Sequence, residues 1–239
     1  MKKIVSIAVL AFVSFCFVSC RFSCDTSKTD DNDGIGITSV RKVRPFDKIV
    51  INAPCEVIYT QGDTLGVKVV GEKESVKKIV TTCKGSTLII DFNEKTKLLG
   101  LSVNYGDVGA TVYITTPDLI GVHLNGAGNF ESQKIVDTDT LNVSLKGAGD
   151  IVMNGIICDE LHGMLRGVGN MELKSLTAKK TDMTLTGVGN VEINFKNSGF
   201  VKCTLQGVGN IDLSGDVRKL NTSLKGTGEI DTDNLNIKE

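Results

Sequence analysis

The stretch LTGVGNVEI, residues 185–193, recurs with small changes through the C-terminal half of the chain. Each copy has a leucine, a variable residue, two glycines around one small residue, an amide or acid, and an apolar residue. The glycine pairs are Gly126 and Gly128, Gly147 and Gly149, Gly167 and Gly169, Gly187 and Gly189, Gly207 and Gly209, and Gly226 and Gly228. Successive pairs lie 19 to 21 residues apart, and a regular period of this size indicates a repeat architecture.

Between the glycine pairs, apolar residues alternate with polar ones, as in LNVSLKG (141–147) and GNVEINF (189–195). A period of two is typical of half-buried strands. A 20-residue unit with two short strands cannot bury its own apolar face, but stacked copies can. We therefore predict a parallel β-helix, or solenoid, with about 20 residues per rung over residues 119–239. An internal column should contain Leu124, Leu145, Leu165, Leu185, Leu205 and Leu224.

Each glycine pair is predicted to form a corner of a rung. Glycine adopts positive φ without the Cβ clash that other residues suffer, so it suits a sharp bend. We expect the residue between the glycines to point into the core at this corner. The polar residues that follow should stack as a ladder of hydrogen-bonding side chains. They are Asn129, Asp150, Asn170, Asn190, Asn210 and Glu229.

The preceding region, residues 41–118, contains short β-branched runs that break at Pro54 and at Gly62–Asp63. The segment EKESVKKIV (72–80) could form one or two helical turns. We predict that this region forms irregular β-rich rungs that cap one end of the stack. Residues 41–239 would then make a single β-helix domain.

The N-terminus predicts export. A basic start precedes an apolar run over residues 4–18, which is typical of a signal peptide, here residues 1–19. The sequence FVSC (17–20) resembles the lipobox of bacterial lipoproteins, which implies cleavage before Cys20 and lipidation of Cys20. Ordinary secretion with a free cysteine is the alternative. The Ser-, Thr- and Asp-rich residues 20–40 are predicted to form a flexible tether. We expect a protein anchored at the outer membrane by its lipid, facing the periplasm or the cell surface.

Charge and motif content argue against several functions. The chain has 27 basic and 28 acidic residues, whereas nucleic-acid-binding proteins usually have a basic excess. No CxxC pair occurs and no cysteine lies near a histidine, so no zinc site is predicted. The glycine pairs lack the third glycine and the helix of a dinucleotide-binding fingerprint. No catalytic residue, metal or cofactor is therefore predicted.

Some side chains leave alternatives open. Cys55 and Cys83 are the one pair that could form a disulfide, and packed free thiols are the other interpretation. His123 and His162 are expected on the surface. Acidic residues recur at one register position, and bound cations, solvent or the neighbouring cations Lys146, Arg166, Lys174 and Lys225 could screen them. These acidic residues are Glu131, Glu172, Glu192, Asp212 and Asp231.

The order of segments resembles a known family. RPFDKIVINAPCEVIYTQGD (44–63) is followed by VKVVGEKESVKKI (67–79), STLIIDF (86–92) and VYITTPDLIGVHLNGAGNFE (112–131), and then by the serial glycine pairs. Over residues 41–239 this order resembles the DUF2807 family, the auto-transporter adhesin head GIN domain. The resemblance implies a right-handed β-helix similar to pectin lyases, an envelope location, an adhesive role and no catalytic residues.

Together these features predict a non-enzymatic cell-envelope lipoprotein that serves adhesion, surface interaction or scaffolding through a repetitive face. The alternative is a carbohydrate-active or glycan-binding β-helix protein. Expected partners are the membrane, through the lipid, and an unidentified protein or glycan. A homo-oligomer is compatible with the sequence, and no nucleic-acid partner is expected.

Overall fold

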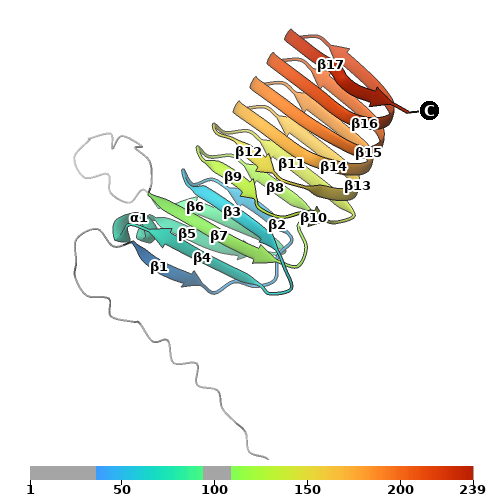
Figure 1. Cartoon of the computed structure of the whole chain (residues 1–239). Helices are drawn as coiled ribbons and strands as arrows, with labels where there is room; N and C mark the ends of the chain where they lie inside the picture. Colours follow the sequence, from blue (N-terminus) through green and yellow to red (C-terminus); the bar gives the residue numbers. More distant parts are fainter. Residues whose placement is uncertain (1–35, 94–108, 239) are drawn as a thin grey trace, which may run out of the picture. The chain divides into compact units, whose positions relative to one another are not determined.

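A computed structural model describes residues 36–93 and 109–238, whose regular secondary structure is nearly all β-strand (Figure 1). The predicted signal peptide and Cys20 lie outside these residues, as does most of the predicted tether. Within the described residues, no helix is long and apolar enough to cross a membrane.

The last repeats form a stack of parallel strands, which Figure 1 shows side by side. They are β13 (Ile156–Leu165), β14 (Val168–Leu185), β15 (Val188–Leu205), β16 (Val208–Leu224) and β17 (Thr227–Ile237). Each pairs in parallel with the next. Between β14 and β15, Gly169 lies opposite Gly189 and Leu185 opposite Leu205. Equivalent positions of successive repeats are therefore neighbours in space, which confirms the predicted solenoid of about 20 residues per rung.

Shorter strands build the earlier rungs of the same stack. They are β8 (Gly121–Leu124), β9 (Asn129–Ser132), β10 (Val136–Asp137), β11 (Thr140–Leu145) and β12 (Ile151–Met153). In one row β11 pairs in parallel with β8 and β13, and in a second row β12 pairs in parallel with β9 and β14. In a third row β10 pairs in parallel with β13. These rows of parallel strands enclose the core.

The core is built from columns of apolar side chains that continue from rung to rung. In the leucine column, Leu124, Leu145, Leu165, Leu185 and Leu205 are each fully buried. Leu224 occupies the same register on the last rung but is 52% exposed, since no described rung covers it. A second column contains the apolar residues after the corner, of which Met171, Val191 and Ile211 are fully buried. The columns account for the strict alternation in the sequence.

The N-terminal region closes the other end of the stack with antiparallel strands. It contains β1 (Ile37–Arg41), β2 (Lys48–Ile51), β3 (Glu56–Gln61), β4 (Gly66–Gly71), α1 (Lys73–Lys78), β5 (Ile79–Lys84), β6 (Thr87–Phe92) and β7 (Ala110–Thr116). Strand β4 is antiparallel to β1 and β7, and β5 is antiparallel to β6. The expected irregular strands and the short helix are present.

Two features of this region were not predicted. Strand β1 begins inside the segment assigned to the tether, because its residues pair with β4. The Arg41 guanidinium fixes its end by donating Nη2 hydrogen bonds to the carbonyl oxygens of Val76 (2.8 Å) and Ile79 (3.1 Å). In addition, β2 lies between β6 and β8, and β3 lies between β7 and β9. A segment early in the chain is therefore inserted between two later ones.

The cysteines of the described residues are packed thiols. Cys55, Cys83, Cys158 and Cys203 are free, so Cys55 and Cys83 do not pair. Burial raises the pKa of Cys55, Cys158 and Cys203 from 9.0 to about 12, with smaller contributions from nearby acidic side chains. These three thiols therefore stay protonated in the folded protein at neutral and mildly alkaline pH.

We expect peptide-resolved alkylation of the native protein at pH 8 to label Cys83, which is half-exposed, and to leave Cys55, Cys158 and Cys203 unlabelled until urea is added. Because the folded pKa of each buried thiol exceeds its unfolded value, their stabilising effect is present below pH 9 and is lost as the pH rises toward 12. Labelling of Cys203 at the same rate as Cys83 in the native protein would contradict this packing.

Candidate functional site

The two glycines of each corner have different roles. From Gly149 onward, the second glycine of each pair has positive φ, as at Gly169 (141°) and Gly189 (146°). The first has no such φ, yet a Cβ added to Gly187 would lie 2.1 Å from the carbonyl oxygen of Gly167 on the preceding rung. A Cβ on Gly189 would meet the carbonyl oxygen of Gly169 at 1.7 Å. The second glycine is thus required for both backbone conformation and close stacking, and the first for stacking alone.

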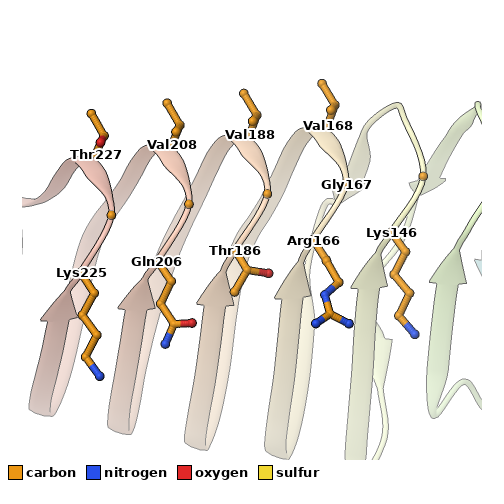
Figure 2. Close-up of a pocket in the computed structure, with 14 residues that line it drawn as sticks. Lys146, Arg166, Gly167, Val168, Thr186, Val188, Gln206, Val208, Lys225 and Thr227 are labelled. Atoms are coloured by element: carbon orange, nitrogen blue, oxygen red, sulfur yellow. The ribbon is translucent and has the colours of Figure 1, made fainter.

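The residue between the glycines points outward, and the expectation that it enters the core was wrong. Val168, Val188 and Val208 are 59%, 50% and 51% exposed. Figure 2 shows these valines, with Thr227 after them, projecting away from the ribbon in one row. The physical reason is that the period of two continues through the corner, so that Leu185 and Val191 lie inside and Val188 lies outside.

A second outward row lies just before the glycine pairs. Figure 2 shows its side chains successively along the stack, one from each rung. They are Lys146, Arg166, Thr186, Gln206 and Lys225. Between this row and the valine row lies a depression of about 680 Å³ whose floor is the glycine backbone. We call this surface, formed by the two rows and the glycines between them, the corner trough.

The corner trough carries positive charge without compensating acidic partners. Within the described residues, the side chains of Lys146, Arg166 and Lys225 form no ion pair or hydrogen bond. Their suggested role as counterions of the acidic residues is therefore not supported. Some lysines elsewhere on the rungs are paired, as in Lys174 Nζ to Glu172 Oε1 (3.1 Å) and Lys202 Nζ to Asp182 Oδ2 (3.2 Å). Other lysines of the described rungs have no ion pair, and they are Lys134, Lys196 and Lys219.

His123 lies near the first cation of the corner trough. Desolvation lowers the pKa of His123, and the positive charges of Lys146 and Lys48 lower it further. His123 and His162 are both half-buried at outward strand positions, so they lie at the surface, as expected, but are not fully exposed. His162 lies 3.3 Å from Glu160, measured from Nε2 to Oε2. The two histidines lie in different register positions, opposite Ser144 and Asn142 respectively.

The polar residues after the corner form the predicted ladder. The backbone N–H of Asn170 and its Nδ2 both donate to Asp150 Oδ1 at 2.9 Å. The N–H of Asn210 donates to Asn190 Oδ1 at 3.2 Å, and the N–H of Glu229 donates to Asn210 Oδ1 at 3.3 Å. Each side chain thus accepts a hydrogen bond from the backbone of the next rung, which strengthens the corner beneath the valine row.

Replacing Asn190 with alanine should lower the free energy of unfolding by about 1 kcal/mol, because the Asn210 N–H loses its acceptor. Urea unfolding followed by circular dichroism measures the change. Asn236→Ala is the matched control, since Asn236 is exposed and lies outside the ladder. Equal stability of the Asn190 and Asn236 variants would contradict a stabilising ladder.

The acidic residues do lie in one column. Glu172 is opposite Glu192, Glu192 opposite Asp212, and Asp212 opposite Asp231. The ion pair between Lys174 and Glu172 supports screening of the acidic column by a neighbouring cation at that rung. In residues 36–93 and 109–238, no group of three or more His, Cys, Asp or Glu side chains is arranged to hold a metal ion.

Sequence reasoning did not identify the corner trough as a surface. Its residues vary in type from repeat to repeat, so they do not form a motif. A signal was nevertheless present, because the period of two assigns Arg166 and Val168 to the same outward side. Applying that period across the glycines would have placed both rows on the surface.

Comparison with known proteins links this fold to a family. The family DUF2807, described as "Putative auto-transporter adhesin, head GIN domain", matches residues 45–207 and 175–239. No curated protein matches the chain significantly.

Solved structures share the fold. A protein from Bacteroides fragilis described as a "putative adhesin" is 23% identical, with a TM-score of 0.67 over 83% of this chain and 97% of that chain. A Parabacteroides distasonis protein described as a "putative lipid binding protein" is 18% identical, with a TM-score of 0.53 and the same coverage. A "putative adhesin" from Parabacteroides merdae is 16% identical, with a TM-score of 0.51 and again the same coverage. With the family match extending over the repeats and the region before them, the chain belongs to the DUF2807 family of adhesin-type head domains.

Proposed function

We propose that the protein is a non-enzymatic adhesin of the cell envelope that holds its partner along the corner trough. The observation that carries this proposal is the alignment of exposed methyl groups on successive rungs beside a row of polar side chains that includes three unpaired cations. A surface of this kind can bind a long partner through many weak contacts that act together.

The arrangement of functional groups favours binding over catalysis. Catalytic groups converge on one reacting atom, within hydrogen-bonding reach of each other. In the corner trough, by contrast, each rung contributes one member of the polar row and one member of the apolar row. Membership of an adhesin-type family supports the same choice.

Attachment of cells tests the proposal. A non-adherent bacterial host that produces the full chain would be applied to surfaces coated with mucin, collagen or albumin, and protease shaving of intact cells would establish that the chain is exposed. We expect more attachment to mucin or collagen than for cells without the chain. If shaving proves exposure and no coating retains the cells, the adhesive function is wrong.

We further propose that lipidation of Cys20 tethers the domain to the outer membrane. The basis is the FVSC stretch at residues 17–20 and the polar segment that follows. In cells fed a labelled fatty acid, the full chain should acquire the label and Cys20→Ala should not. Cys24→Ala is the matched control and should be labelled like the wild type. Equal labelling of the Cys20→Ala variant and the wild type would exclude this anchor.

A further inference from the structure

We infer that the corner trough binds an extended anionic polysaccharide, with its carboxylates at the cationic positions and its hydroxyl groups at the neutral ones. This inference rests on the proposed adhesive function and names the chemical class of the ligand. Lys146, Arg166 and Lys225 would receive the carboxylates. Thr186 and Gln206 would hydrogen-bond to the hydroxyl groups between them.

The charge distribution is the first argument. The three cations lie in one row of the corner trough and have no acidic partner within the described residues. Lys146 and Arg166 are on adjacent rungs, and Lys225 follows after two neutral rungs. A ligand complementary to this row therefore carries carboxylates that can reach the three cations and hydroxyl groups that can reach the two neutral rungs.

The neutral rungs supply the second argument. The hydroxyl group of Thr186 donates to the Leu165 carbonyl oxygen at 3.5 Å, the limit of a hydrogen bond, so it is available to a better partner. The Gln206 amide offers two donors and an acceptor. Hydroxyl groups of a sugar both donate and accept, and so they match a threonine followed by a glutamine.

The floor of the corner trough argues against an acidic peptide as the occupant. A peptide that binds by adding a strand needs unpaired backbone groups at a sheet edge. Here the backbone is occupied, since the N–H of Val188 donates to the Gly167 oxygen and the N–H of Val208 to the Gly187 oxygen, both at 3.0 Å. Binding therefore depends on the two rows of side chains.

The spacing and the valines complete the argument. Rungs repeat at about 4.8 Å, which is close to the length of one sugar residue in an extended chain. Val168, Val188 and Val208 then present one apolar contact per rung to the C–H faces of successive rings. No aromatic side chain lines the surface, so it lacks the stacking platform of a single-stranded nucleic-acid site.

The test measures binding of the purified full chain to oligogalacturonate, with dextran as the neutral polymer and poly-glutamate as the anionic peptide. The combined variant Lys146→Gln, Arg166→Gln and Lys225→Gln should weaken oligogalacturonate binding by about tenfold or more. The control variant Lys174→Gln, Lys180→Gln and Lys202→Gln has the same net charge but alters cations that are ion-paired on other surfaces. It should bind like the wild type.

Three results would overturn the inference. They are binding of oligogalacturonate no tighter than dextran, binding of poly-glutamate as tight as oligogalacturonate with the same dependence on the three cations, or equal weakening by both triple variants. Replacing Val188 with serine gives a second measurement, because the residue is exposed and the variant should fold; binding unchanged by this substitution would contradict the apolar contacts. Attachment to mucin or collagen without binding of oligogalacturonate would refute the ligand class and leave the adhesive function standing.

Discussion

Replacing Gly189 with alanine is expected to reduce the free energy of unfolding by on the order of 4 kcal/mol, the range reached by the most damaging single substitutions. Gly189 has a φ of 146°, which a residue with a Cβ rarely adopts. The new methyl group would also lie 1.7 Å from the carbonyl oxygen of Gly169. This oxygen belongs to the backbone of the preceding rung, which strand pairing holds in place. Chemical denaturation followed by circular dichroism would measure the loss.

The control for this substitution is Gly66→Ala. Gly66 lies in strand β4, has no positive φ, and a Cβ added there would meet nothing within 4 Å. We expect this variant to be as stable as the wild type within about 0.5 kcal/mol. If the Gly66 and Gly189 variants unfold at the same denaturant concentration, close stacking of the corners does not limit stability.

Truncating Leu185 to alanine should cost about 2–5 kcal/mol, the range measured for fully buried leucines. Leu185 has no exposed surface and lies between Leu165 and Leu205 in the leucine column, so the cavity is enclosed from both sides. The same truncation at Leu224, in the same column but 52% exposed, should cost less than about 1 kcal/mol. Urea unfolding of the two variants compares one substitution in two environments.

The comparison also tests how the rungs are organised. In a stack whose repeats contact only their neighbours, stability is a sum of repeat and interface contributions. Hydrogen exchange in Leu185→Ala should therefore accelerate most on β13, β14 and β15, and least on β4 and β7. An effect as large for Leu224 as for Leu185 would mean that the buried column is not the main source of stability.

The repeats could be predicted from the sequence because the same short motif recurs and forms the same corner in each rung. Gly189 and Asn190 identify one corner, and the spacing between copies determines which residues become neighbours. Alternation around Leu185 then identifies the buried side of each strand. Period, core columns and polar ladder all follow from these three observations.

The other bends of the rungs had no comparable signal. Ser175, with a φ of 48°, precedes Leu176, whereas Asn197, with a φ of 51°, follows Phe195, the partner of Leu176 on the next rung. Gly215, with a φ of 91°, lies opposite Phe195. The residue with positive φ thus differs in type and in position from rung to rung, and the register between strands shifts there. Each rung therefore bends with different residues, so no recurring motif could be recognised.

The N-terminal topology was also beyond local patterns. The placement of β2 between β6 and β8 depends on pairing between segments that are far apart in the chain. Alternation in KIVI (48–51) indicates a strand but does not identify the strands with which it pairs. The corner trough could not be recognised for a different reason. The period of two places its residues on the outside, but a small apolar residue between two glycines is also typical of a core position.

At the corner trough, the residues that maintain the fold are distinct from the residues that face solvent. The glycines and the asparagine ladder fix the backbone, whereas the positions before and between the glycines contribute little to the core. Substitutions at Arg166, Val168, Thr186, Val188 and Gln206 should therefore alter recognition at little cost to folding. These positions offer a starting point for libraries of engineered binders in which selectivity is changed rung by rung.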